Sequence, residues 1–188
     1  MMYTETKIKG IWIIEPNVFS DPRGYFMESY RESEFIRHIG EVHFIQDNES
    51  RSVQGVLRGL HYQLEPCAQS KLVRVICGKV LDVAVDIRRN SPTFGQYVAM
   101  ELSGENKRQM FIPGGFAHGF YVMSETAVFT YKVDRPYTPA YERGIRFDDP
   151  AIGIDWRIIP GSAIATSGKD RNAPLLSDAE NNFTYSEK

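Results

Sequence analysis

The sequence predicts an all-β protein, an antiparallel sandwich or barrel for which a jelly roll is the best fit. Between residues 56 and 133, short runs of β-forming residues recur at a spacing of roughly 8–12 residues, separated by Gly, Pro, Ser and Asn. The runs lack the intervening helices that parallel βαβ units require. Such a ladder is typical of antiparallel sandwiches and barrels. The predicted strands are 56–63, 71–77, 79–87, 95–102, 108–112, 117–123 and 126–133.

Shorter patterns precede this ladder. The β-formers of residues 8–19 predict a strand, and residues 20–24 predict a turn, because Asp-Pro starts turns and Gly tolerates positive φ. Residues 25–30 predict a short strand and residues 42–50 an extended segment. The helix formers of residues 33–40, which end in a glycine, predict one short helix.

A looser segment rich in turn residues follows the ladder. Here we expect a short strand near residues 145–147 and a short helix near residues 177–182. The length suits one domain with a substantial core. We therefore expect a single domain over residues 1–188, with N-terminal strands at 1–50, a barrel at about 51–135, and a C-terminal wall and tail at 136–188.

Composition excludes several classes of protein. A net charge of −2 argues against a nucleic-acid or membrane surface set by bulk charge. No apolar run is long enough to span a membrane, and the N-terminus lacks the layout of a signal peptide. Cys67 and Cys77 show no C-x-x-C spacing, which favours two reduced thiols in the cytosol. We expect a soluble, cytoplasmic protein.

Two predicted strands carry charged side chains where core strands usually carry apolar ones. Arg58 and His61 lie in the run that begins at Gly55, and Lys71 opens the run that ends at Gly78. Buried charge is costly unless it is paired or used. These strands are therefore expected to line a site, although satisfied core histidines remain an alternative for both His61 and His118.

The same stretch resembles the cupin superfamily, whose motifs are G-x5-H-x-H-x3–4-E-x6-G and P-x-G-x2-H. Gly55 precedes His61 by the required interval, and the second motif is intact from Pro113 to His118. Gln63, however, replaces the second histidine, and Lys71 stands where the glutamate is expected. An ammonium group repels a metal cation and offers it no lone pair. The resemblance implies a cupin-like jelly-roll barrel with a few short helices, and the replacements predict no metal site.

A pocket with these residues suits removal of a proton next to a carbonyl. The reaction needs a base of near-neutral pKa, a cation or donor where the enolate oxygen forms, and an acid that returns the proton. His61 suits the first role and Lys71 the second. Tyr131 is a candidate acid, since it shares a strand face with Phe129 and Val133. A core tyrosine with a bonded hydroxyl is the alternative.

At a finer level, the chain resembles the dTDP-4-dehydrorhamnose 3,5-epimerase family over nearly its whole length. The matching stretches include Asp21-Pro-Arg-Gly24, Glu28-Ser-Tyr30, Gln46-Asp-Asn48, Val56-Leu-Arg-Gly-Leu-His61, Gln69-Ser-Lys-Leu-Val73, Asp82-Val-Ala-Val-Asp-Ile-Arg88, Ser91-Pro-Thr-Phe-Gly95, Gly115-Phe-Ala-His-Gly-Phe120 and Tyr131-Lys132. Phe147-Asp-Asp-Pro150, Pro113-Gly-Gly115 and residues 156–167 depart from the usual family pattern. These departures affect details of the C-terminal wall.

The resemblance implies an epimerase that needs neither metal nor cofactor. It would invert C3 and C5 of a dTDP-linked 4-keto-6-deoxyglucose, feeding dTDP-L-rhamnose synthesis for cell-surface polysaccharide. By resemblance, His61 is the base, Tyr131 the acid and Lys71 the group that stabilises the enolate, while Asp170 orients His61. Asp82 and Asp86 are rivals for the role of Asp170, and ordinary structural acids are the alternative for both.

The resemblance also implies a nucleotide site. Guanidinium groups suit a diphosphate, and the matching positions are Arg23 and Arg58. The remaining implied contacts are Gln46, Asp47 and Asn48 beside the diphosphate, Glu28 at the thymine edge, Tyr137 stacked on the base, and His118, Glu142 and Lys169 around the substrate. Taken singly, each of these is more simply a solvated side chain.

One difficulty concerns Arg58 and His61, which point to opposite faces of a regular strand. A bulge at Gly59 would bring both side chains into one pocket. Alternatively, Arg58 serves a pocket shared across a dimer. The resemblance implies a homodimer in which N-terminal segments contribute to the partner's site.

Three other functions remain open. An epimerase that acts at only one centre of the same sugar would share most of these residues. A metal-dependent cupin enzyme such as an oxygenase is disfavoured by Gln63 and Lys71. A non-catalytic nucleotide-sugar binder is disfavoured by the joint presence of His61, Lys71 and Tyr131.

Overall fold

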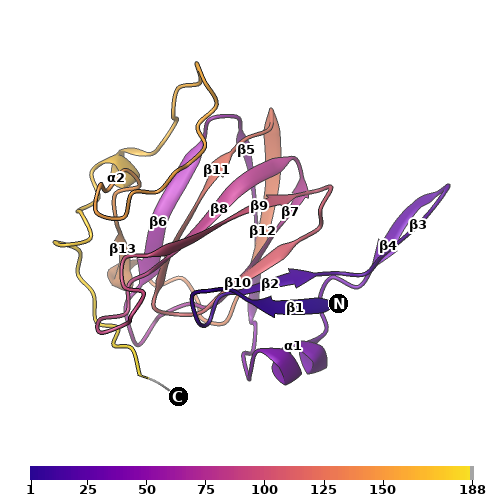
Figure 1. The fold of residues 1–188 in the computed structure, drawn as a ribbon, viewed down its shortest axis with the longest axis horizontal. Coiled ribbons are helices and arrows are strands. Elements are labelled where there is room, and N and C mark those ends of the chain that lie inside the picture. Colours follow the sequence, from indigo (N-terminus) through magenta and orange to yellow (C-terminus); the bar gives the residue numbers. More distant parts are fainter. Residues whose placement is uncertain (187–188) are drawn as a thin grey trace.

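The structure is a computed structural model that describes residues 1–186 and consists mainly of β-strands (Figure 1). Its N-terminal elements are β1 (Met2–Glu5), β2 (Trp12–Glu15), β3 (Val18–Asp21), β4 (Gly24–Met27), α1 (Glu32–His38) and β5 (Gln46–Val53). The central strands are β6 (Leu57–Gln63), β7 (Lys71–Cys77), β8 (Lys79–Asp86), β9 (Tyr97–Ser103), β10 (Gln109–Ile112), β11 (Phe116–Val122) and β12 (Thr126–Val133). A 3-10 turn (Pro139–Tyr141), β13 (Glu142–Gly144) and α2 (Gly168–Arg171) follow.

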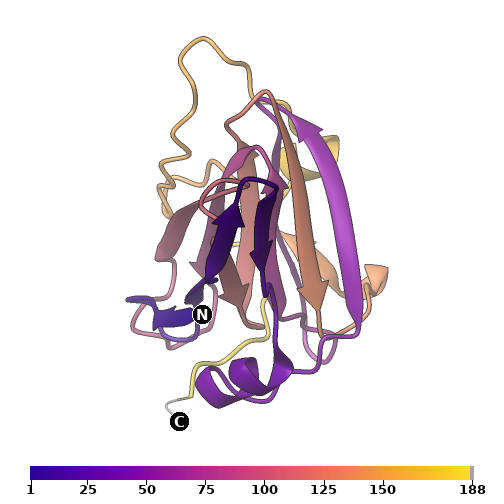
Figure 2. The same ribbon diagram turned by 90° about the vertical axis from the view of Figure 1, so that its right-hand side faces the viewer.

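The strands form two facing antiparallel sheets. One has the order β1-β2-β10-β7-β12-β5 and the other the order β13-β6-β11-β8-β9. The apolar core contains residues of both sheets, and Figure 2 looks onto the six-stranded sheet with the five-stranded sheet behind it. The prediction of an all-β sandwich with a few short helices is confirmed. No helix within residues 1–186 is long and apolar enough to cross a bilayer.

Strand alternation explains which side chains enter the core. Along β7, Val73 and Val75 join the cluster between the sheets, whereas Leu72 points to the other face and packs with Phe35 of α1 and Phe111 of β10. Phe35 and Phe111 meet edge to face, with ring centroids 5.1 Å apart. The contact holds α1 against the outer face of the six-stranded sheet, below the strands in Figure 2.

The elements differ from the sequence predictions in several places. Residues 8–19 form two strands, β2 and β3, rather than one, because Pro16 lacks a backbone N–H and interrupts the ladder between them. Strand β1 was not predicted, and its polar sequence gives little signal outside its pairing with β2. The short strand expected near 145–147 lies earlier, as β13.

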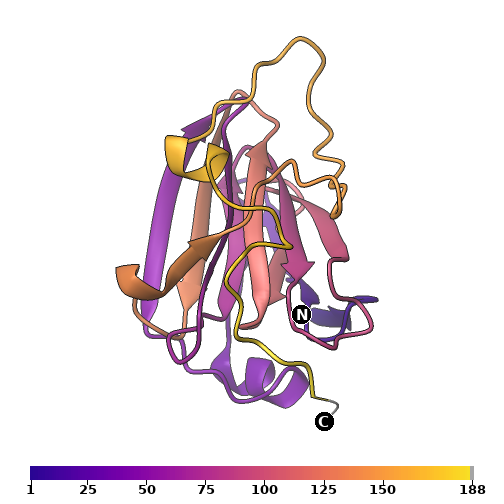
Figure 3. The ribbon, with the colours of Figure 1, turned by 90° about the vertical axis from the view of Figure 1, so that its left-hand side faces the viewer.

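The helix predicted near residues 177–182 is wrong, since this segment forms turns and extended backbone. Two of its side chains bond to backbone groups that lie just beyond the ends of β8 and β6. Asn181 donates to the carbonyl of Ile87, and the Asn182 side chain bonds both backbone groups of Glu65. Figure 3 shows this C-terminal segment running along the outside of the five-stranded sheet.

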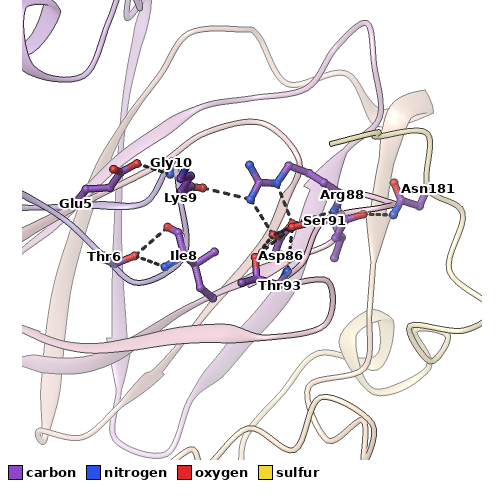
Figure 4. A network of polar contacts seen from close by, with 11 residues as sticks. Glu5, Thr6, Ile8, Lys9, Gly10, Asp86, Arg88, Ser91, Thr93 and Asn181 are labelled. Atoms are coloured by element: carbon purple, nitrogen blue, oxygen red, sulfur yellow. Dashed lines mark hydrogen bonds and ion pairs between the residues drawn. The ribbon is translucent and has the colours of Figure 1, made fainter. Parts of the chain in front are cut away.

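A buried polar network joins the N-terminal loop to the end of β8 (Figure 4). The carboxylate of Asp86, which has no exposed surface, accepts hydrogen bonds from the Arg88 guanidinium and from the hydroxyls of Ser91 and Thr93. Arg88 also donates to the carbonyl of Lys9. The network therefore links segments that are far apart in the sequence.

Strands β3 and β4 form a separate hairpin that projects from the body of the molecule (Figure 1). Phe19 and Phe26 face each other across the hairpin and are 65% and 71% exposed. A two-stranded hairpin is marginally stable in water without a packed face. The exposed phenylalanines mark this hairpin as a surface suited to contact with another chain.

Candidate active site

A pocket of about 730 Å³ opens between the two sheets and is closed on one side by residues 165–171. Eight of the predicted site residues line it, and they come from five strands and from α2. They are Arg58, His61, Lys71, His118, Tyr131, Glu142, Lys169 and Asp170. The sandwich thus gathers residues that lie more than a hundred positions apart in the sequence.

The side chains of His61 and Asp170 form a short hydrogen bond inside the pocket. Nε2 of His61 donates to Oδ1 of Asp170 over 2.6 Å. Asp170 is fixed by α2, where its backbone N–H donates to the Oγ of Ser167, the N-cap of this short helix. Burial opposes ionisation of Asp170, but the hydrogen bond from His61 holds its pKa below the ordinary value.

A bulge in β6 brings Arg58 and His61 to the same side. His61 lies opposite His118 of β11, but Arg58 lies opposite Phe120, so the register shifts between the two pairs. Gly59 lies at the shift with φ of +121°, and a Cβ there would approach the Cα of Gly119 to 2.6 Å. Only glycine fits this position. The predicted bulge is confirmed.

The three acids considered as partners of His61 have separate contacts. Asp170 contacts His61, whereas both carboxylate oxygens of Asp82 lie 3.0 Å from Nε2 of His118. Asp86 lies in the Arg88 network. The His118–Asp82 pair is almost fully buried, and burial lowers the pKa of His118 even though Asp82 opposes the shift.

Lys71 and Tyr131 enter the pocket from neighbouring strands, β7 and β12. Burial lowers the pKa of Lys71 to about 8, against the opposing influence of Asp82 and Glu142. Burial also raises the pKa of Tyr131, and the nearby Arg58 offsets part of that shift. The pocket therefore holds an ammonium that loses its proton unusually easily and a phenol that keeps its proton unusually well.

Three of the residues predicted to bind substrate contact one another, and two of them, Glu142 and Lys169, line the pocket. Glu142 contacts both the hydroxyl of Tyr137 and the ammonium of Lys169. Burial disfavours a charge on Glu142, but hydrogen bonds from Lys169 and Tyr137 hold its pKa below the ordinary value. Arg171 also lines the pocket and was missed, because nothing in its sequence position besides adjacency to Asp170 marked it.

Gln63, which stands in place of the second cupin histidine, has a structural role. Its amide donates to the carbonyls of Cys67 and Pro136 and accepts from the N–H of Thr138. Gln63 therefore ties two loops together. Across residues 1–186, no three His, Cys, Asp or Glu side chains converge as a metal site requires.

Comparison with known proteins identifies the family. The family model described as dTDP-4-dehydrorhamnose 3,5-epimerase matches residues 5–178. The chain belongs to this family. It is 52% identical over 181 residues to the dTDP-4-dehydrorhamnose 3,5-epimerase of Shigella flexneri, with 96% of this chain and 98% of the relative covered.

Solved structures of this family have the same fold. A dTDP-6-deoxy-D-glucose-3,5-epimerase from Legionella pneumophila, in complex with dTDP-4-keto-L-rhamnose, is 50% identical with a TM-score of 0.90 and coverage of 94% of this chain and 93% of that chain. A 3′-monoepimerase from Streptomyces bikiniensis, in complex with dTDP-quinovose, is 33% identical with a TM-score of 0.86 and coverage of 92% and 87%. The predictions of an isomerase of this family and of a cupin-like fold are confirmed.

Not all predicted contacts of the epimerase lie in the pocket. Arg23 is on the projecting hairpin, where it pairs with Asp21, and Glu28 pairs with Arg31 at the surface. Strand alternation puts Asp47 on the outer face of the six-stranded sheet, paired with Lys132. The remaining two predicted contacts sit on the inner side of β5, where Gln46 donates to Asn48 and Asn48 lies opposite Tyr131.

Proposed function

We propose that this protein inverts C3 and C5 of dTDP-4-dehydro-6-deoxy-D-glucose, giving dTDP-4-dehydro-L-rhamnose for dTDP-L-rhamnose synthesis. The observation that carries the proposal is the His61–Asp170 pair, which shares one pocket with Lys71 and Tyr131. These groups match the base, enolate stabiliser and acid that epimerisation beside a ketone needs. The reaction requires no metal or cofactor, and with two free thiols the protein suits the cytoplasm.

His61 begins each inversion. It takes the proton from the carbon next to the C4 ketone, and the electron pair of the broken C–H bond moves toward the ketone oxygen to form an enolate. Asp170 stabilises the imidazolium that results, because its carboxylate accepts the hydrogen bond from Nε2. The ammonium of Lys71 stabilises the charge on the enolate oxygen.

Tyr131 completes the inversion. It belongs to the sheet that faces His61, and inversion requires an acid on the side of the ring opposite the base. The phenol returns a proton to the same carbon, and the enolate electrons form the new C–H bond. His61 then loses its proton to solvent and Tyr131 regains one. Since C3 and C5 both flank C4, one set of groups serves both carbons.

The nucleotide binds through cationic side chains of the pocket. Arg58, Lys169 and Arg171 line the pocket and suit a diphosphate. Tyr137, whose ring is more than half exposed, is available to stack on the thymine. Asn48 and Gln46 supply further polar contacts at the inner edge of β5.

Arg23 and Glu28 act in the site of a partner subunit. Both lie on or beside the β3–β4 hairpin, whose exposed phenylalanines suit a dimer contact. Co-expression of Arg23→Ala with His61→Ala tests this. If the hairpin serves the partner, one of the two sites in each mixed dimer has both residues intact. Random pairing makes about half of the dimers mixed, so the whole population regains about a quarter of the normal sites. No recovery above the parent variants would contradict the shared site.

Proton NMR in heavy water with a chelator present tests the reaction. The purified protein is incubated with dTDP-4-keto-6-deoxyglucose, and deuterium is expected to enter at both C3 and C5. Absence of deuterium from both carbons would refute the proposed chemistry for this sugar. Binding without exchange would indicate a nucleotide-sugar binder.

A single-centre epimerase is the second candidate. The 33% identical relative from Streptomyces bikiniensis is a 3′-monoepimerase with the same fold, which supports considering this activity. The same experiment separates the two, because a 3-epimerase introduces deuterium at C3 alone.

A further inference from the structure

A serine beside the pocket holds one of its arginines in place. Ser52 lies on β5 and is 6% exposed. Its hydroxyl accepts two hydrogen bonds from Arg58, from Nε over 3.2 Å and from Nη2 over 3.1 Å. Arg58 itself is exposed and lines the pocket. Among residues 1–186, Ser52 is the only group that accepts a side-chain hydrogen bond from Arg58.

The position of Ser52 is unusual for a polar residue. In the antiparallel register it lies opposite Ala127, which is buried in the core, and Ser50 and Asn48 follow it on the same inner face. The facing residues of β12 are mostly apolar there. A buried hydroxyl is costly unless it is hydrogen-bonded, and Arg58 supplies those bonds.

The geometry leaves Arg58 able to bind a ligand. Guanidinium donors form a rigid planar fork. Ser52 accepts from Nε and Nη2, so it leaves Nη1 unengaged on a side chain that lines the pocket. An unanchored arginine would lose considerable rotamer freedom on binding a phosphate. Anchoring by Ser52 reduces that loss.

We propose that Ser52 is a positioning residue for substrate affinity, which holds the guanidinium of Arg58 ready for the diphosphate of the nucleotide sugar. The proposal rests on the proposed function, because it assigns the diphosphate to this pocket. Ser52 contacts no reacting atom in this scheme. Its effect should therefore appear in binding and not in the proton transfers.

Replacement of Ser52 by alanine tests the idea. We expect Ser52→Ala to raise KM, and the Kd for dTDP measured by calorimetry, by about 3- to 10-fold, with kcat nearly unchanged. Ser52→Thr keeps the hydroxyl and should restore most of the affinity. Ser103→Ala removes another buried, hydrogen-bonded serine that lies far along the chain on β9, and it should leave both constants unchanged.

A double-mutant cycle separates positioning from a general effect on folding. If Ser52 acts through Arg58, the Ser52→Ala change adds little to the affinity lost in Arg58→Ala. Full additivity, or a fall in kcat without a change in dTDP affinity, would overturn the proposal. If wild-type protein binds dTDP but does not exchange protons, the proposed reaction fails while the cycle still tests Ser52. Absence of dTDP binding by wild-type protein would refute both.

Discussion

Asp86 and Asp170 are both buried, but Asp86 stabilises the fold whereas Asp170 belongs to the proposed catalytic site. Asp86 accepts hydrogen bonds from Arg88, Ser91 and Thr93 (Figure 4). The Arg88 guanidinium in turn lies over the rings of Phe116 and Tyr185. Asp170 has one short bond, to His61, and the side chain of His61 is 33% exposed. Both carboxyl groups have pKa values below the ordinary range, because their partners oppose the effect of burial.

The difference lies in the partner. Nε and Nη2 of Arg88 are engaged by Asp86 and by the Lys9 carbonyl, and its guanidinium is covered by the Phe116 ring, so we call this network closed. The ring of His61 has one nitrogen bonded to Asp170 and faces the pocket with the rest of its surface. A closed network stabilises the fold, whereas an open one keeps an atom available for a substrate. The following predictions test that distinction.

The largest expected effect comes from the open network. His61→Ala should lower the rate of deuterium exchange at both C3 and C5 by about 10²- to 10⁴-fold, the usual contribution of a general base. The free energy of unfolding and the affinity for dTDP should change little, because His61 is partly exposed. Proton NMR in heavy water measures the exchange rate, and calorimetry measures both the affinity for dTDP and the unfolding. A parallel loss of dTDP affinity would show that His61 binds rather than reacts.

The closed network should behave in the opposite way. Asp86→Asn leaves Arg88 without its ionic partner, and breaking a buried ion pair typically costs about 3–5 kcal/mol. We expect the unfolding midpoint in urea to fall strongly, while exchange per folded molecule stays normal. Reduced exchange at full stability would mean that the network reaches the site.

Acid titration sharpens this second test. The pKa of Asp86 is lowered by folding, so its contribution to stability is present above the ordinary pKa of 3.8 and is lost as the pH falls through the lower value in the folded state. The stability difference between wild type and Asp86→Asn should therefore shrink on acidification below that pH. A constant difference would show that charge is not the cause.

Lys71 gives a smaller, pH-dependent effect at the open site. Its pKa of about 8 means that the ammonium needed for the enolate is lost as the pH rises above that value. Asp82 and Glu142 face it and favour the charged form, and Tyr131 does not interfere because burial raises its pKa. The exchange rate should fall about tenfold per pH unit well above the Lys71 pKa. A rate that rises there would point to neutral Lys71 as a base.

The sequence predicted much of the fold because the central strands have strong local signals. The bounds of 71–77 and 126–133 agree with β7 and β12, since glycine or other turn residues flank runs of β-formers. The helix predicted near 177–182 is wrong because Asn181 and Asn182 bond to the backbone just after β8 and β6. Local propensity cannot reveal such distant partners.

The site was predictable to a similar degree. His61 and Lys71 stood out as charges on core strands, and the glycine between Arg58 and His61 indicated the bulge. Asp170 was named only through the family resemblance, because more than a hundred residues separate it from His61. Arg23 lies outside the pocket, on the projecting hairpin. The sequence of one chain does not indicate whether such a hairpin contacts its own pocket or that of another subunit.

The smallest predicted effect lies at the outer edge of the closed network, where the Tyr185 ring lies 5.0 Å from the Arg88 guanidinium. Tyr185→Ala keeps the backbone bond to Arg89 and removes only this cation–π contact and some packing. At a partly exposed site the contact is worth about 0.5–1 kcal/mol, so urea unfolding should shift slightly and exchange should not change. The pairing of Asp86 with Arg88 survives this substitution, which is why the loss should be far smaller than for Asp86→Asn. A comparable loss in the two variants would mean that the aromatic clamp, and not the buried carboxylate, holds this network together.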